Sequence, residues 1–163
     1  MNNNYFAYFE KVQYKNKWIN ILIKLNKIIT YIVYLSFISL VIYLFFTERH
    51  IFYKVILTTS ISFFLVSVFR RLINAKRPYE VMDIKPLINK DTKGNSFPSR
   101  HVFSVFIIAT VYMYIYMPIG ITLIILGIIL AAVRVLSGVH FLRDVICGAI
   151  IGILFGALGM SIL

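Results

Sequence analysis

Residues 102–133 read VFSVFIIATVYMYIYMPIGITLIILGIILAAV, a run of 32 residues without a charged side chain. At about 1.5 Å per residue, this run is too long for one helix across a hydrocarbon core about 30 Å thick, and it suits two short ones. Pro118 and Gly120 predict a turn in its middle, between Val102–Met117 and Ile119–Val133. The stretch therefore predicts a helical hairpin inside a membrane.

Apolar runs on both sides of the hairpin extend this pattern. The three further runs are Ile28–Phe46, Ile51–Phe69 and Val145–Leu163. Lys54 is the one charge within them, near the start of its run. The glycines of the last run recur every four residues, at Gly148, Gly152 and Gly156, which favours close packing of another helix backbone. We therefore predict an all-α, multi-pass transmembrane bundle of about five spans, forming a single domain over residues 1–163.

The composition indicates a membrane protein with anionic partners. Of 163 residues, 60% are hydrophobic and 14% are charged, too few charges for the surface of a soluble domain of this size. The 17 Lys and Arg residues exceed the 6 Asp and Glu residues, which gives a net charge of +11. Lipid headgroups and phosphate esters fit this excess. Nucleic acid fits it poorly, because the basic residues border membrane spans. Cys147 is a single cysteine, so no intramolecular disulfide is possible.

The first 27 residues differ from the spans. Lys17, Asn20, Lys24 and Lys27 recur at helical spacing, and apolar residues lie largely on the opposite side. We predict an amphipathic helix within residues 1–27 that lies in the membrane interface, and a sixth span is the alternative. A signal peptide is not expected, because lysines interrupt the segment and it lacks a small-residue cleavage site.

Five spans place segments 70–101 and 134–144 on the side of the membrane that holds the N-terminus. The first polar block there begins directly after a span and contains Arg70 and Arg77. These two residues are seven apart, so both can lie on one face of a helix. Basic residues that end a span are common, so this block alone indicates little more than anchoring.

The second and third blocks contain groups that suit catalysis. Pro98 and Ser99 favour a helix start, whose free backbone N–H groups bind anions, and Arg100 and His101 follow directly. In the third block, Arg134 precedes a histidine and an aspartate four residues apart, His140 and Asp144. That spacing places the pair on one face of a helix, where a carboxylate can fix the imidazole tautomer. A helix cap and a structural His–Asp pair are the simpler alternatives.

Together the blocks predict a phosphoryl-transfer site. Several cations, a hydroxyl and a helix start can bind phosphoryl oxygens, and phosphoryl transfer depends mainly on such binding. One histidine could attack phosphorus while the other protonates the leaving oxygen. Only one acidic residue belongs to the constellation, so we expect no metal ion and no other cofactor.

These blocks resemble the three motifs of the type 2 phosphatidic acid phosphatase family of membrane lipid phosphatases. The matching residues, in order and spacing, are Arg77-Pro78, Pro98-Ser99, His101, Arg134, His140 and Asp144. The resemblance runs from Arg70 to Asp144. It implies that His140 is a nucleophile forming a phosphohistidine, that Asp144 orients it and that His101 protonates the departing lipid alkoxide. It also implies that Arg77, Ser99 and Arg134 hold the phosphoryl oxygens.

Three positions depart from the family pattern. Arg70 replaces the usual Lys, which keeps the charge but changes its reach. Arg100 replaces the usual Gly and adds a charge that suits a diphosphate. Val133 replaces the usual Ser and removes one possible donor. We expect Arg70 and Arg100 to contact the substrate, and we expect an active enzyme because no proposed proton-transfer group is lost.

The expected substrate is a lipid with a phosphate or diphosphate headgroup. The short chain is similar to bacterial family members that act on undecaprenyl diphosphate, in cell wall lipid recycling; phosphatidylglycerophosphate and phosphatidic acid are the alternatives. A non-catalytic membrane protein that binds anionic lipid is the alternative from another class. The oligomeric state is left open by the sequence.

Two arguments disagree about which side of the cell membrane holds the site. The family resemblance implies an extracytoplasmic site. Without Arg70, Arg77, Arg100 and Arg134, the side with the motifs still carries 11 Lys and Arg residues against 2, so the positive-inside rule favours the cytoplasm. We expect the extracytoplasmic face, because cations kept for function distort the count.

Overall fold

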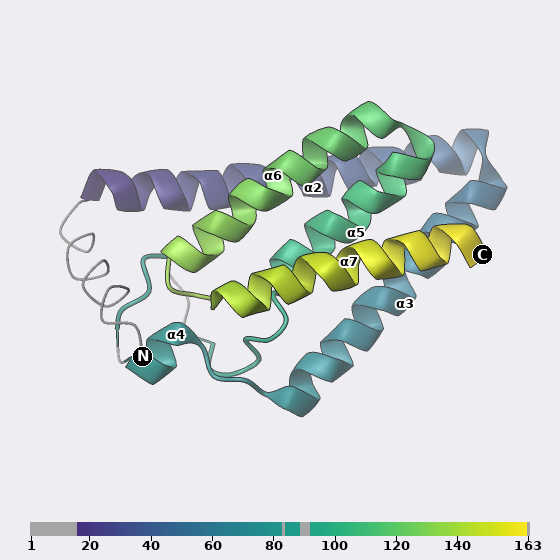
Figure 1. Ribbon diagram of the computed structural model, residues 1–163. Helices are drawn as coiled ribbons and strands as arrows, with labels where there is room; N and C mark the ends of the chain where they lie inside the picture. The colour runs from purple at the N-terminus through teal and green to yellow at the C-terminus, as the bar shows by residue number, and fades with distance from the viewer. Residues whose placement is uncertain (1–15, 83, 89–91, 163) are drawn as a thin grey trace.

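The computed structural model describes residues 16–82, 84–88 and 92–162, and these residues form helices and loops without a β-strand. The helices are α2 (Asn16–Thr47), α3 (Arg49–Ile73), α4 (Pro78–Met82), α5 (Arg100–Ile115), α6 (Met117–Leu136) and α7 (Leu142–Ile162). The long helices run along one another, with α4 and the longer loops gathered at one end of the bundle (Figure 1). The predicted all-α bundle is confirmed.

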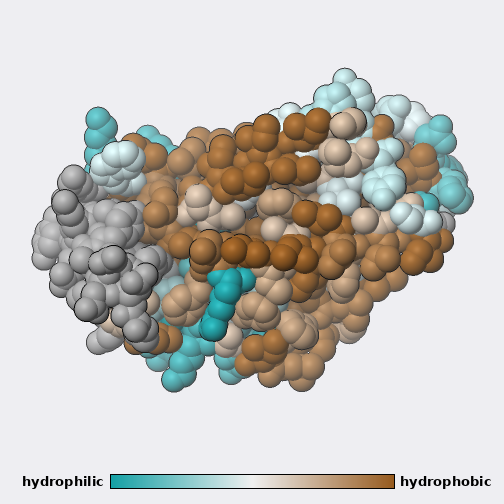
Figure 2. Space-filling view, viewed as in Figure 1, coloured by the Kyte–Doolittle hydropathy of each residue, from teal (hydrophilic) through white to brown (hydrophobic). Residues whose placement is uncertain are grey.

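Four segments of the described chain have the lengths and compositions of membrane spans. The segments long and apolar enough to cross a membrane are Lys17–Thr47, Arg49–Met82, Met117–Leu136 and Leu142–Ile162. Helix α5 is a shorter apolar helix of 16 residues. Apolar side chains cover much of the flank of the bundle in Figure 2, as expected where lipid surrounds a protein. The chain is therefore a multi-pass membrane protein.

Helix α5 lies at the centre of the bundle and packs closely on α7. A Cβ atom added at Gly148 would lie 2.7 Å from the carbonyl oxygen of Ser99. One added at Gly152 would lie 2.8 Å from the carbonyl oxygen of Phe103. Since real side chains do not approach backbone so closely, only glycine permits this packing. The close contact predicted from the glycine repeat is confirmed, and it brings the start of α5 against the start of α7.

The N-terminal segment differs from the prediction of a separate amphipathic helix within residues 1–27. Residues 1–15 lie outside the described part of the chain, and the remainder is the beginning of α2, which continues unbroken into the first span. Leu22 lies in an apolar cluster with Leu87 and Val133. This contact with distant segments holds the start of α2 against the bundle.

Candidate active site

The three polar blocks meet around one cavity of about 230 Å³ at the end of the bundle that carries α4. Its lining residues are Arg70, Arg77, Thr92, Lys93, Gly94, Asn95, Arg100, His101, Arg134 and His140. Six of the eight predicted site residues are among them, and the other two, Ser99 and Asp144, are fully buried nearby. No carboxylate lies among these described lining residues, and within the described ranges no cluster of His, Cys, Asp or Glu could hold a metal ion.

His140 and Asp144 form a buried pair behind this cavity. The Nδ1 atom of His140 lies 3.5 Å from the Oδ2 atom of Asp144, and the backbone N–H of Phe141 donates to the same oxygen at 3.0 Å. The two residues do not share a helix face as predicted, because α7 begins only at Leu142 and His140 lies in the turn before it. The pair nevertheless forms across the helix start. Since Nδ1 faces Asp144, Nε2 lies at the opposite edge of the ring.

Ser96 completes this group, although the sequence did not predict it as a site residue. Its Oγ atom lies 2.5 Å from Oδ2 of Asp144 and 3.3 Å from Nδ1 of His140. The side chain is fully buried. Ser96 is separated from His140 and Asp144 by 44 and 48 residues, so no periodic pattern in the sequence links it to them. Only its position just before Pro98-Ser99 indicated that it could belong to the site.

The surroundings of His140 keep its imidazole neutral. Burial lowers the pKa of His140 from 6.5 to about 4. The hydrogen bond with Asp144 opposes this shift, whereas the charges of Arg134 and Arg77 add to it. At neutral pH the ring therefore carries a single proton, the state that a nucleophile or a general base requires.

Arg70 and Arg77 donate hydrogen bonds to the loop before α5. We call this loop, residues 94–98, the 94–98 segment. The two arginines do not share a helix face as predicted, because α3 ends at Ile73 and Asn74 adopts a left-handed conformation. Arg70 donates to the carbonyl oxygens of Asn95, Ser96 and Pro98, and Arg77 to those of Gly94, Asn95 and Val139. Both arginines line the cavity while most of their donors hold backbone in place.

The carboxylate of Glu80 supports the same segment. It accepts hydrogen bonds from the backbone N–H groups of Arg77, at 2.8 Å, and Gly94, at 2.9 Å. This side chain therefore fixes the wall of the cavity through backbone contacts.

Arg134 has two buried donors left without acceptors, and Nε of Arg70 is a further one. The Nη1 atom of Arg134 donates to Oδ1 of Asn26 on α2 at 3.1 Å, whereas its Nε and Nη2 are buried without a hydrogen-bond partner. The hydroxyl of Ser99 is also buried without a partner. Because unpaired buried donors are costly, they indicate a ligand rich in acceptor oxygens. Sequence reasoning missed Asn26, which is separated from Arg134 by 108 residues.

The start of α5 lies at the cavity as predicted. Ser99 occupies the N-cap position without a side-chain capping hydrogen bond, and its backbone N–H donates to the carbonyl oxygen of Asp144 at 2.8 Å. The side chain of Arg100 is exposed, and its guanidinium lies 5.2 Å from the centre of the Phe63 ring. Val133, in contrast, is buried in the apolar cluster that holds the start of α2.

A family profile matches most of the chain. The profile of the PAP2 superfamily covers residues 51–163. The chain belongs to the PAP2 superfamily. The resemblance to the type 2 phosphatidic acid phosphatases is thus confirmed, and the protein is a membrane phosphatase of this superfamily with a lipid phosphate as its class of substrate.

Two solved structures resemble this PAP2 protein. The crystal structure of Aquifex aeolicus LpxE matches with a TM-score of 0.69 and 26% identity, over 89% of this chain and 93% of LpxE. That of a PAP2-type phosphatidylglycerolphosphate phosphatase from Bacillus subtilis matches with a TM-score of 0.62 and 21% identity, over 96% of this chain and 90% of the phosphatase. The second likeness shows a shared fold. No curated protein matches the chain.

Proposed function

We propose that this PAP2 protein hydrolyses undecaprenyl diphosphate through a phosphohistidine and without a metal ion. The observation that carries the proposal is the polar cavity lined by Arg134, whose buried Nε and Nη2 atoms have no partner. The hydroxyl of Ser99, buried nearby, has no partner either. A phosphoryl group supplies the acceptor oxygens that these donors require. Arg100, at the rim of the same cavity, adds a cation for the second phosphate of a diphosphate.

In the first step, Nε2 of His140 attacks the terminal phosphorus. A P–N bond forms as the bond from phosphorus to the bridging oxygen breaks, and His101 donates a proton to the departing oxygen of the lipid monophosphate. With a monoester substrate, the departing group is the lipid alcohol. Hydrogen bonds to the transferring group come from Arg70, Arg77, Ser99, Arg100 and Arg134. The four guanidinium groups also neutralise its charge.

In the second step, water releases the phosphate. His101, now neutral, accepts a proton from water as its oxygen attacks phosphorus and the P–N bond breaks. Inorganic phosphate leaves, and His140 returns to its neutral state. Asp144 keeps the imidazole oriented in both steps and stabilises the positive charge that develops on it.

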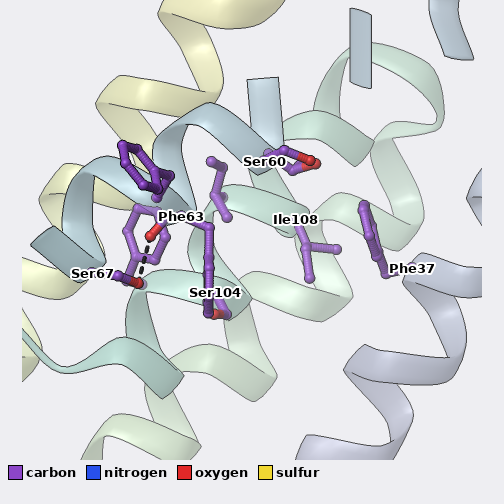
Figure 3. A pocket seen from close by; sticks show the side chains of 10 residues that line it. Phe37, Ser60, Phe63, Ser67, Ser104 and Ile108 are labelled. Carbon is purple, nitrogen blue, oxygen red and sulfur yellow. Dashed lines mark hydrogen bonds between the residues drawn. The ribbon is translucent and has the colours of Figure 1, made fainter. Parts of the chain in front are cut away.

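Apolar cavities beside the site suit the lipid chain. A cavity of about 420 Å³ shares Arg100 and His101 with the polar cavity. A further cavity of about 510 Å³ adjoins it, because both are lined by Phe37, Phe63, Ser104 and Ile108. Figure 3 shows these side chains converging from α2, α3 and α5. We infer that the chain of the substrate lies here while its headgroup occupies the polar cavity.

The proposal is tested by assaying the purified protein in detergent with excess chelator. The substrates are undecaprenyl diphosphate, phosphatidylglycerophosphate and phosphatidic acid. We expect phosphate release with chelator present, and the highest kcat/KM for undecaprenyl diphosphate. His140→Ala should abolish release, whereas His50→Ala, an exposed histidine at the opposite end of α3, is the control. A strict need for a divalent metal, or a preference for another lipid, contradicts the corresponding part of the proposal.

We also propose that the site faces the extracytoplasmic side of the cell membrane. Lys93 lines the cavity and is exposed, so Lys93→Cys in a Cys147→Ala background reports the side. We expect a membrane-impermeant thiol reagent to label this variant in intact cells. Protection in intact cells, followed by labelling after lysis, contradicts the extracytoplasmic assignment.

A further inference from the structure

We propose that Ser96 is a positioning residue that donates to Asp144 and thereby, as an acceptor for Nδ1, sets the tautomer of His140. The proposal rests on three heavy-atom distances within one buried group. Ser96 Oγ lies 2.5 Å from Asp144 Oδ2 and 3.3 Å from His140 Nδ1, and the two partners are themselves 3.5 Å apart. Ser96 is thus closer to each of them than they are to each other.

The hydrogen-bonding capacities of the three groups fix the direction of each bond. A carboxylate can only accept, so the single proton of the Ser96 hydroxyl is donated to Asp144. The remaining lone pairs of Oγ then face Nδ1 of His140 and can only accept from it. Nδ1 must therefore carry the imidazole proton. In the neutral ring, Nε2 is left unprotonated, which is the form that attacks phosphorus.

The direction of these hydrogen bonds also distinguishes Ser96 from a nucleophilic serine. A nucleophilic serine donates its proton to the histidine and is open to substrate. Here the proton goes to Asp144, the side chain is fully buried, and Ser96 does not line the polar cavity. Ser96 therefore acts on the reaction through His140 and does not touch the phosphoryl group.

The backbone around Ser96 is held in place on both sides. Its N–H donates to the carbonyl oxygen of Ala75 at 2.8 Å, and its carbonyl accepts from Arg70 at 3.4 Å. Arg77 donates to the carbonyl oxygen of Val139, directly before His140, at 3.2 Å. Arg70 and Arg77 therefore have a second role beside charge neutralisation. Their hydrogen bonds hold the backbone at Ser96 and next to His140, so that the two side chains lie together.

Kinetics with three variants test the role of the hydroxyl. The inference rests on the proposed reaction, in which His140 is the nucleophile. Loss of a hydrogen bond to a charged group predicts that Ser96→Ala lowers kcat by about 10- to 100-fold and leaves KM within about twofold. Ser96→Thr retains the hydroxyl and should recover most of this loss. Ser39→Ala, an exposed serine on α2, is the matched control. A Ser96→Ala enzyme with the kcat of the wild type overturns the inference.

The tautomer itself can be measured without any turnover. In protein labelled with ¹⁵N-histidine, the two imidazole nitrogens of His140 report which of them is protonated. We expect the Nδ1–H form in the wild type and in Ser96→Thr, and a mixture with the Nε2–H form in Ser96→Ala. An Nε2–H form in the wild type, or an unchanged tautomer in a folded Ser96→Ala variant, overturns the inference. If the wild type shows the Nδ1–H form but releases no phosphate from any lipid, the proposed function fails and the role in positioning His140 stands.

Discussion

The Nδ1 atom of His140 lies 3.5 Å from the Oδ2 atom of Asp144, and less than 3% of either side chain is exposed. His140 lines the polar cavity and Asp144 does not. The imidazole therefore contacts a carboxylate on its buried side and faces the polar cavity on the other. The same pair explains why the lone acidic residue of the motifs lies at the start of α7.

Removing the charge of Asp144 should impair catalysis without weakening substrate binding. In Asp144→Asn the amide can donate to Nδ1, which favours the tautomer with the proton on Nε2 and stabilises the imidazolium less well. We expect kcat to fall on the order of 10³-fold, with KM little changed. Steady-state kinetics in detergent measure both constants, and a large rise in KM with kcat unchanged would contradict this role.

His140 should stay neutral well into the acid range. Its pKa is about 4 in the folded protein, so its ¹⁵N signals should stay nearly constant between about pH 8 and pH 6. Comparison with His140→Asn assigns these signals among the three histidines. A titration midpoint near pH 6.5 would show that burial does not lower the pKa of His140.

The same shift predicts how stability depends on pH. The unfolded chain binds a proton at this residue near pH 6.5, but the folded chain does so only near pH 4. The contribution of His140 to stability is therefore fully present above about pH 6.5 and is lost as the pH falls toward 4. Melting temperatures should fall less in His140→Asn over this range, and an equal fall in both proteins would count against the predicted linkage.

Gly148 should tolerate no side chain. The Cβ atom of Gly148→Ala would lie 2.7 Å from the carbonyl oxygen of Ser99, so α5 and α7 must separate. We expect a loss of about 1–3 kcal/mol in the free energy of unfolding and a lower kcat, since Ser99 and Asp144 lie at this contact. Leu154→Ala, on the exposed side of α7, is the control. A melting temperature equal to that of the wild type would show that the contact is looser than described.

Arg100 should discriminate between headgroups. Arg100 lines both the polar cavity and the adjoining apolar cavity. We expect its cation to bind the second phosphate of a diphosphate. Arg100→Gly should lower kcat/KM for undecaprenyl diphosphate about 10-fold more than for phosphatidic acid. Equal losses for the two substrates would contradict a role in selecting a diphosphate.

Local patterns predicted the spans and most of the residues around the cavity. The hairpin and the glycine repeat of α7 depend on neighbours in the chain, so sequence alone predicted both. The position of the turn was wrong: it lies at Tyr116, and Pro118 and Gly120 belong to α6, because proline is tolerated in the first turn of a helix. The separation of four residues also identified His140 and Asp144, although their contact forms at a helix start and not along a helix. Their roles in the reaction stay a prediction.

Contacts between distant segments were not predictable in the same way. Ser96 reaches His140 only because two arginines bind the carbonyl oxygens of the 94–98 segment. Asn26 reaches Arg134 only because α2 begins earlier than predicted and packs against the bundle. The start of α2 has the sequence pattern of an interfacial helix. Such a pattern does not show whether lipid or the rest of the protein covers the apolar face of the helix.

The most direct test of the account is a search for phosphate bound to His140 during turnover. Wild-type protein is mixed with lipid substrate carrying ³²P in its terminal phosphate, quenched within milliseconds and digested. We expect an acid-labile, alkali-stable label on the peptide that contains His140, absent from His140→Ala and present in His50→Ala. Full phosphate release by a folded His140→Ala variant, with no labelled peptide in the wild type, would contradict it.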